Sequence, residues 1–212
     1  MLAGDPTDWV ARFRSLDARF LDCILEVWPI CVATIPNEPD EDTITINLVK
    51  LLNLNVKARR LFHQLAYQHE PFGYNSKGWA YSKGKIDMAL LLDQERERYL
   101  AYECKRLNVA RNGQTRSLAT PYVREGMLRF VTGQYSAGLP VACMLGYVLD
   151  GNVVAAEFKV RTAIDLNSTD IALMGTPTAS RRVGTIRRFS SRHRRLSNGT
   201  NIEIRHALLP FP

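Results

Sequence analysis

The sequence predicts a single-domain α/β protein in which helices flank a central mixed β-sheet. Apolar residues recur every three or four positions in some segments, as in amphipathic helices, and form short continuous runs in others, as in buried strands. The expected order, α-α-β-β-α-β-α-β-β, departs from a strict β-α-β repeat. With 212 residues, 46% of them hydrophobic, the chain is long enough to bury one sizeable core.

Two helices are expected in the first part of the chain. The segment 8–28 has apolar residues at helical spacing, namely Trp9, Phe13, Leu16, Phe20, Ile24 and Val27. The acidic stretch 36–42 interrupts this pattern. Asp42 or Thr43 is then suited to cap a second helix that runs to residue 66, and a turn-rich segment, 74–84, follows.

From residue 85 onward the pattern changes to that of strands. Two apolar runs flank the polar residues 93–98, and this predicts a β-hairpin over 85–105. The remaining expected elements are a helix between Pro121 and Gly138, a buried strand over 140–149, a helix over 151–167, and closing strands over 184–193 and 202–210.

Composition argues against several classes of protein. The first 20 residues carry regularly spaced charges instead of the apolar core of a secretory signal, and no apolar stretch approaches the ~20 residues that span a bilayer. The sequence therefore predicts a cytoplasmic protein with no membrane contact. The four cysteines and four histidines lack zinc-ligand spacing, which favours buried reduced thiols and no structural metal.

The net charge of +7 is unevenly distributed, because residues 181–195 contain seven arginines and no acid. Such a cluster attracts polyanions, since each neutralised phosphate releases condensed counterions. It predicts a nucleic-acid-binding surface made of Arg181, Arg182, Arg187, Arg188, Arg192, Arg194 and Arg195. The alternative is a solvated arginine-rich face, and charge alone does not separate the two.

Three charged residues interrupt the apolar pattern of the expected hairpin. Glu103 and Lys105 are two apart and share one face of a strand, while Cys104 faces the other way. If Asp87 on the partner strand lies beside them, two carboxylates and an amine converge. Carboxylates with water suit Mg²⁺ (or Mn²⁺), which polarises phosphates, and the lysine would orient or deprotonate the attacking water.

The pairing of the two strands makes this hypothesis testable. Directly opposed residues share a face, so Asp87 has to lie opposite residue 103 or 105. A six-residue turn over 93–98 would place Asp87 opposite Cys104, on the wrong face. The hypothesis therefore requires an odd-numbered turn, a bulge or a bend.

A second E-x-K triplet, Glu157-Phe158-Lys159, lies in a segment expected to be helical. There the two charged side chains would diverge by about 200° around the helix axis, so this triplet is set aside.

An I-D pair that begins an apolar run, followed by E-x-K and a helix, resembles the PD-(D/E)xK nuclease superfamily, which has a restriction-endonuclease-like fold. The resemblance covers residues 41–149, with a nuclease core over about 41–160 and basic strands over 181–212. It implies Mg²⁺-dependent phosphodiester hydrolysis, most often of DNA. It also implies Asp87, Glu103 and the Cys104 carbonyl as metal ligands and Lys105 as the catalytic lysine. Among helix-borne acids, Glu41 is the best match and Glu70 the second.

The chain departs from the family pattern at two places. Ile86 stands where the name of the superfamily has proline, and Gln134 and Tyr135 are adjacent instead of forming a Q-x-x-x-Y motif. Arg129, on the helix after E-x-K, suits contact with the scissile phosphate, or alternatively a surface pair with Glu125. This helix resembles those of small nuclease-like proteins of bacterial defence loci, which implies anti-phage defence with a homodimer or a larger complex.

Two other classes of function stay open. One is a nucleic-acid-binding subunit without catalysis, in which the nuclease-like fold is only a scaffold. The other is an interaction module whose hydrophobic C-terminus, 206–212, docks a partner chain.

Overall fold

The computed structural model describes residues 6–111 and 114–211, and its core is one seven-stranded sheet. The strands of this sheet are β1 (Gln64–His69), β4 (Ile86–Leu91), β5 (Tyr99–Leu107), β8 (Val141–Val148), β9 (Arg181–Val183), β10 (Ile186–Arg194) and β11 (Asn201–Pro210). Their spatial order is β1-β4-β5-β8-β11-β10-β9. β8 runs parallel to both of its neighbours and the other pairs are antiparallel, so the sheet is mixed, as predicted.

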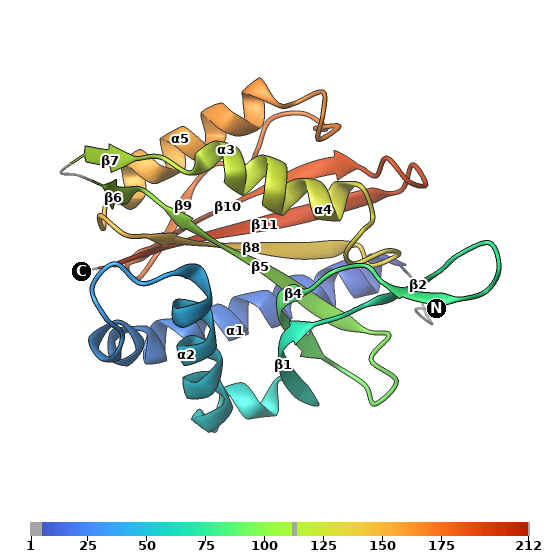
Figure 1. Ribbon diagram of the computed structural model, residues 1–212, viewed down its shortest axis with the longest axis horizontal. Coiled ribbons are helices and arrows are strands. Elements are labelled where there is room, and N and C mark those ends of the chain that lie inside the picture. Colours follow the sequence, from blue (N-terminus) through green and yellow to red (C-terminus); the bar gives the residue numbers. More distant parts are fainter. Residues whose placement is uncertain (1–5, 112–113, 212) are drawn as a thin grey trace.

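Helices cover both faces of this sheet (Figure 1). On one face lie α1 (Pro6–Thr34) and α2 (Glu41–Leu54). On the other lie α5 (Val153–Leu166) and a continuous helical segment made of α3 (Ala119–Pro121), the π-helical η2 (Tyr122–Met127) and α4 (Leu128–Val131). The predicted α/β fold class, a central mixed sheet flanked by helices, is confirmed.

The second helix begins earlier and ends earlier than its sequence predicted. Asp40, and not Asp42 or Thr43, is the N-cap, because its side chain accepts a hydrogen bond of 2.6 Å from the Thr43 amide. The helix ends at Leu54, where the Asn55 side chain accepts from a later amide and turns the chain. Residues 64–66, expected in the helix, instead belong to the edge strand β1, which pairs with β4.

The predicted hairpin is present as β4 and β5. Leu91 pairs with Tyr99, so residues 92–98 form the connection and their number is odd. The segment 74–84, expected to be turns, includes part of a two-stranded ribbon of β2 (Phe72–Tyr74) and β3 (Ala80–Ser82). A second small ribbon pairs β6 (Val109–Arg111) with β7 (Gln114–Arg116).

The centre of the sheet is apolar on both faces. Every residue of β8 is buried, as expected for a strand with helices above and below it. The C-terminal strand β11 is also interior: Leu208 and Leu209 are fully buried, and the carbonyl of Pro210 accepts a hydrogen bond from the Trp28 indole. The hypothesis that this segment docks a partner chain is therefore wrong, because it is already packed inside the fold.

The four cysteines are buried free thiols, as predicted. In the part of the chain that the structure describes, no helix combines the length and the apolar character needed to cross a membrane.

Candidate active site

The pairing of β4 with β5 brings the acid of the first strand to the correct face. Met88 lies opposite Tyr102, at the end of the paired residues, and this register directs Asp87, the next residue of β4, to the same face as Glu103. Of the three arrangements that would satisfy the hypothesis, the chain thus adopts the odd-numbered connection. Asp87 is fixed there because its Oδ2 accepts a 2.6 Å hydrogen bond from the Cys104 amide.

The Lys105 ammonium lies at the centre of a group of oxygens. Its Nζ is 3.0 Å from Glu103 Oε1 and 3.9 Å from Asp87 Oδ2. It also donates a hydrogen bond of 2.8 Å to the Cys104 carbonyl. The three side chains and the carbonyl that the sequence singled out are therefore side by side.

Glu41 joins the same group from α2, one of the two helices on the α1 side of the sheet. It occupies the first turn of α2, and its Oε1 is 2.8 Å from Lys105 Nζ while its Oε2 accepts from the Arg106 amide at 3.0 Å. Glu70, the second choice for a helix-borne acid, lies next to β1 and is 3.8 Å from Lys85. The structure thus brings Glu41, and not Glu70, to Lys105.

Arg129 points into the group from the other side. Its Nη1 donates to Glu103 Oε1 at 2.8 Å and to the Tyr135 hydroxyl at 3.2 Å, whereas no ion pair joins it to Glu125 within the described residues. The π-helical segment η2 precedes it and passes close over β5, since a Cβ on Gly126 would lie 3.6 Å from Glu103 Cγ. We call Asp87, Glu103, Lys105, Glu41 and Arg129 the candidate site.

Burial and neighbouring charges have opposing effects on the pKa values of the candidate site, and the pKa values of Asp87, Glu103 and Lys105 are all raised. Burial raises the pKa of Glu103 to about 7, with a further rise from Asp87, while Lys105 and Arg129 oppose it. Burial likewise raises the pKa of Asp87 to about 6. Burial alone would lower the pKa of Lys105, but the surrounding carboxylates raise it above its usual range. The carboxylates thus favour the charged form of Lys105, which suits it to orienting a substrate or water.

The candidate site has an unbalanced charge and an unsatisfied atom. Three carboxylates face two cations, and Glu103 Oε2 is buried with no hydrogen-bond partner among the described residues. A buried carboxylate oxygen without a partner is costly, so it calls for a cation or a donor that completes the site. Carboxylate and carbonyl oxygens are the ligands that Mg²⁺ prefers, and Asp87, Glu103, Glu41 and the Cys104 carbonyl fit such an ion.

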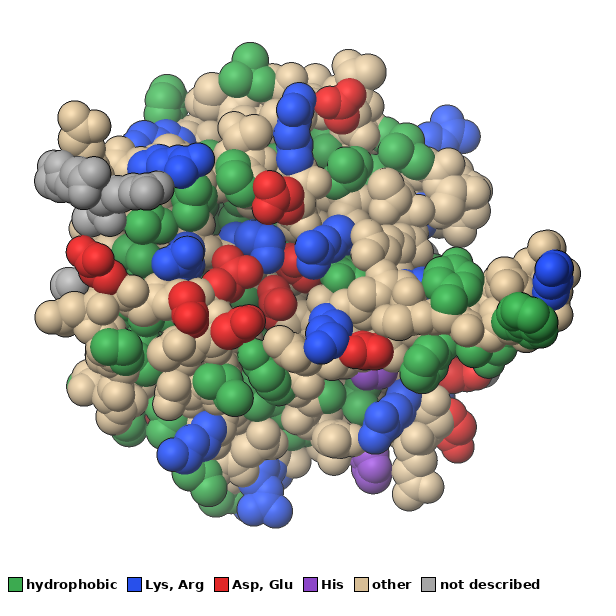
Figure 2. All heavy atoms as spheres, viewed as in Figure 1, with side chains coloured by type: hydrophobic (Ala, Val, Ile, Leu, Met, Phe, Trp, Pro, Cys, Tyr) green, Lys and Arg blue, Asp and Glu red, His purple; other side chains and the backbone are tan. Residues whose placement is uncertain are grey.

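The Lys105 ammonium lies between the three acids. No group of three or more His, Cys, Asp or Glu side chains is arranged to hold a metal ion in residues 6–111 and 114–211. Binding of a cation would thus require Lys105 Nζ to withdraw from at least one carboxylate. Figure 2 shows acidic side chains gathered near the centre of one face of the molecule, with lysine and arginine side chains around them.

The second E-x-K triplet is helical, as predicted. Glu157 lies in α5 and binds Arg161 at 2.7 Å and Arg187 at 2.5 Å, away from the candidate site. Its carboxylate therefore ties α5 to β10 and has a structural role.

The predicted arginine surface divides into several environments. Arg187 pairs with Glu157, and Arg188 pairs with Asp17 at 2.6 Å. Arg195 is only 2% exposed and donates to the carbonyls of three residues, so it stabilises the core, and its prediction as a surface contact is wrong. The exposed members of the run are Arg181, Arg182, Arg192 and Arg194.

The sequence analysis missed the ribbon of β2 and β3. Four of its aromatic side chains are half or more exposed, Phe72, Tyr74, Trp79 and Tyr81, and residues 72–85 contain three lysines and no acid. The ribbon adjoins the candidate site because the Tyr135 hydroxyl, which accepts from Arg129, donates to the Lys85 carbonyl at 2.7 Å. The alternation of aromatic and basic residues in "YNSKGWAYSKGK" was the available signal.

Comparison with known proteins identifies no relative: no family model, no curated protein and no solved structure matches this chain.

Proposed function

We propose that the protein is a metal-dependent nuclease that hydrolyses phosphodiester bonds, in DNA as its main substrate, in anti-phage defence. The observation that carries this proposal is the convergence of three carboxylates on Lys105, with a buried oxygen of Glu103 left without a partner. The resemblance of Asp87 and Glu103-x-Lys105 to the PD-(D/E)xK pattern supports the same activity.

Each residue has a distinct role in this proposal. Asp87, Glu103, the Cys104 carbonyl and Glu41 would hold Mg²⁺, whose charge polarises the phosphate and makes water more acidic. Lys105 carries a stable positive charge and orients the attacking water and a phosphate oxygen. Arg129 holds Glu103 in place and, being 36% exposed, still reaches solvent as a planar phosphate donor. Overall, water replaces one ester oxygen on phosphorus and yields a phosphomonoester and an alcohol.

The surroundings of the candidate site also suit a nucleic acid. The exposed aromatic side chains of the β2–β3 ribbon provide surfaces on which bases stack, and its lysines attract the phosphate backbone. The cytoplasm, where foreign DNA is met, is the expected location. Cutting both strands of a duplex needs two sites, which a homodimer or a larger defence complex would supply.

The decisive experiment is plasmid nicking with Mg²⁺, with EDTA, and with the Lys105→Ala variant. Removing one positioned charge-stabilising donor lowers catalytic rates by about 10²–10³-fold, so we expect at least this loss. Lys159→Ala, in the second E-x-K triplet, is the matched control and should cleave as the wild type does. Cleavage that survives EDTA, or that Lys105→Ala and Lys159→Ala leave equal, would overturn the proposal.

A second candidate function is nucleic-acid binding without catalysis. One observation favours it: Lys105 is already paired with Glu41 and Glu103, as it would be in a purely structural ion cluster. In that case the wild type would bind DNA in a salt-sensitive way without cutting it, and Mg²⁺ would not raise its melting temperature.

A further inference from the structure

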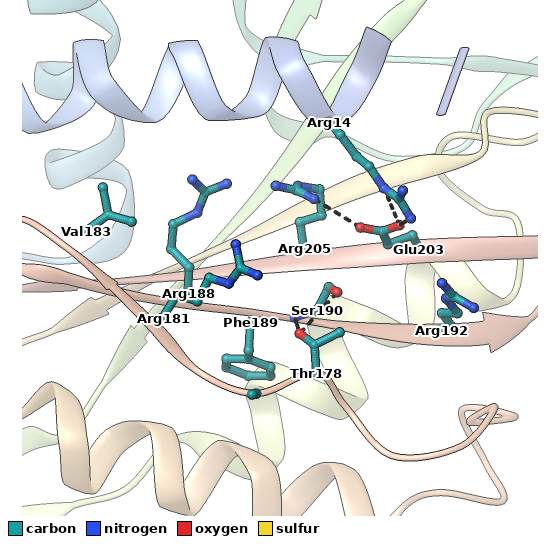
Figure 3. A pocket seen from close by; sticks show the side chains of 11 residues that line it. Arg14, Thr178, Arg181, Val183, Arg188, Phe189, Ser190, Arg192, Glu203 and Arg205 are labelled. Carbon is teal, nitrogen blue, oxygen red and sulfur yellow. Dashed lines mark hydrogen bonds and ion pairs between the residues drawn. The ribbon is translucent and has the colours of Figure 1, made fainter. Parts of the chain in front are cut away.

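A second charged region lies at the far end of the sheet, beneath α1. It is a cavity of about 460 Å³, within the size range of small-molecule sites. Figure 3 shows its lining, which brings together arginines from α1, β9, β10 and β11. We call it the arginine cavity; its charged residues are Arg14, Arg181, Arg188, Arg192, Arg205 and Glu203.

The arginine cavity and Glu103 of the candidate site lie on opposite faces of the sheet. Glu103 pairs with Met144 and Met144 pairs with His206, so these three side chains share one face. Arg205 precedes His206 in β11 and therefore points to the other face, where it binds Asp17 of α1 at 2.6 Å. The sheet thus separates a ligand in the arginine cavity from Glu103.

The arginine cavity has an excess of positive charge. Asp17 accepts from Arg188 and Arg205, and Glu203 accepts from Arg205 and Arg14. Two carboxylates thus face five guanidinium groups. Among the residues that the structure places, Arg181 and Arg192 have no acidic partner, although both line the cavity.

The two carboxylates also fix the arginines in place. Asp17 Oδ2 accepts 2.6 Å hydrogen bonds from both Arg188 Nη2 and Arg205 Nε, and these two side chains are only 15% and 20% exposed. Each guanidinium has five N–H donors, so most donors of Arg188 stay available to a ligand. The hydroxyl groups of Ser190 and Thr178 add further donors to the wall.

We propose that the arginine cavity binds a small molecule bearing two or more phosphate groups. Arginine forks match phosphate oxygens bidentately, and the excess positive charge suits an oligophosphate. Among the described residues that line it, the cavity offers no free aromatic face for a base. Phe189, its one aromatic lining residue, has His206 stacked 4.3 Å away and the Arg161 guanidinium also 4.3 Å from its ring centre. Recognition therefore rests on the phosphates.

The test uses inorganic tripolyphosphate as the probe, titrated calorimetrically into the full chain in EDTA. The Arg181→Ala/Arg192→Ala double variant removes the two arginines without acidic partners and should weaken binding at least tenfold. The matched control is Arg182→Ala/Arg194→Ala, which removes the same charge from exposed arginines of β9 and β10 that do not line the cavity. The control should bind within twofold of the wild type.

Three results would overturn the proposal. The first is that the wild type does not bind tripolyphosphate, and the second is that both double variants are weakened equally. The third is that a single-stranded oligonucleotide binds more tightly than tripolyphosphate and loses this affinity in Arg181→Ala/Arg192→Ala. The last result would make the region a strand-binding groove. Glu103→Gln should bind tripolyphosphate like the wild type, so the outcome is independent of the nuclease proposal.

Discussion

The candidate site and the arginine cavity use the same two kinds of side chain in opposite proportions. In the candidate site three carboxylates surround Lys105 and Arg129, and the acids are in excess. In the arginine cavity five guanidinium groups share two carboxylates. The excess charge therefore has opposite signs in the two regions, negative in the candidate site and positive in the arginine cavity.

The two regions also differ in whether the groups without a full set of partners are buried or exposed. In the candidate site the least exposed group is Glu103, an acid with an unsatisfied oxygen. In the arginine cavity the buried groups are paired, and the arginines without acidic partners are exposed. A buried oxygen without a partner is costlier than exposed charge, so the imbalance is more costly in the candidate site than in the arginine cavity.

The largest expected effect comes from Glu103→Gln, which keeps the shape of the side chain and removes its charge. Phosphodiester cleavage should fall by about 10³-fold, equivalent to about 4 kcal/mol, because a central ligand is lost. The initial rate of plasmid nicking in Mg²⁺ measures it. Glu157→Gln, a change of another buried glutamate outside the candidate site, is the control. Equal rates in the two variants would remove Glu103 from the chemistry.

The next effect tests the other region and concerns stability. Asp17→Asn leaves Arg188 and Arg205 without their shared charge, and it weakens the 2.8 Å hydrogen bond from the Tyr102 hydroxyl. Breaking a buried ion pair on one side should lower the free energy of unfolding by about 3 kcal/mol, as measured by urea denaturation. Asp22→Asn, on an exposed position of the same helix, should change it by less than about 0.5 kcal/mol. Equal stability of the two variants would contradict the assignment.

The hairpin and its charged residues were predictable from the sequence because the relevant physics is local. Alternation along a strand places Glu103 and Lys105 on one face. Only the face of Asp87 was left open, because it depends on whether the number of residues in the connection is odd or even. In the structure the connection is odd-numbered, and carboxylate oxygens of Asp87 and Glu103 lie 3.9 Å and 3.0 Å from Lys105 Nζ. Glu41 was also predictable, since an acid in the first turn of α2 projects from a helix end beside the hairpin.

The arginine cavity could not be predicted because its partners are far apart in the sequence. Arg14 meets Glu203 across almost the whole chain, and Arg205 meets Asp17 in the same way. The run 181–195 looked like one surface, but side chains in β10 alternate between the two faces of the sheet. Arg187 therefore binds α5 while Arg188 binds α1.

A third region of the sheet holds a buried network of polar side chains in which the neutral form of histidine is favoured. Ser191 Oγ is 2.7 Å from His193 Nε2 and 2.9 Å from His206 Nε2, and the Tyr122 hydroxyl is 3.0 Å from His206 Nδ1. Burial lowers the pKa of His193 to about 4, below the value near 6.5 of an unfolded chain. Burial also lowers the pKa of His206, with contributions from His193 and Arg161.

The contribution of His193 to the free energy of unfolding should therefore fall with acidification. Between its folded and unfolded pKa values the unfolded chain binds a proton that the folded chain does not. The contribution of His193 should decrease by about 2 kcal/mol from about pH 6.5 to about pH 4.5. Asp87 and Glu103, whose pKa values are raised, act in the opposite direction over this range. The measurement is thus the difference in unfolding free energy between the wild type and His193→Gln, which should narrow on acidification; parallel curves would contradict it.

The smallest effect concerns Glu41, the acid at the rim of the candidate site. It is 29% exposed while Glu103 is fully buried, so water replaces part of its function when its charge is removed. Glu41→Gln should lower cleavage about tenfold, or about 1.4 kcal/mol, and raise the Mg²⁺ concentration needed for half-maximal rate. Glu70→Gln, which removes an acid paired with Lys85, should change the rate less than about twofold. A loss as large as that of Glu103→Gln would make Glu41 an equal ligand, whereas no loss would leave it as a structural partner of Lys105 and of the Arg106 amide.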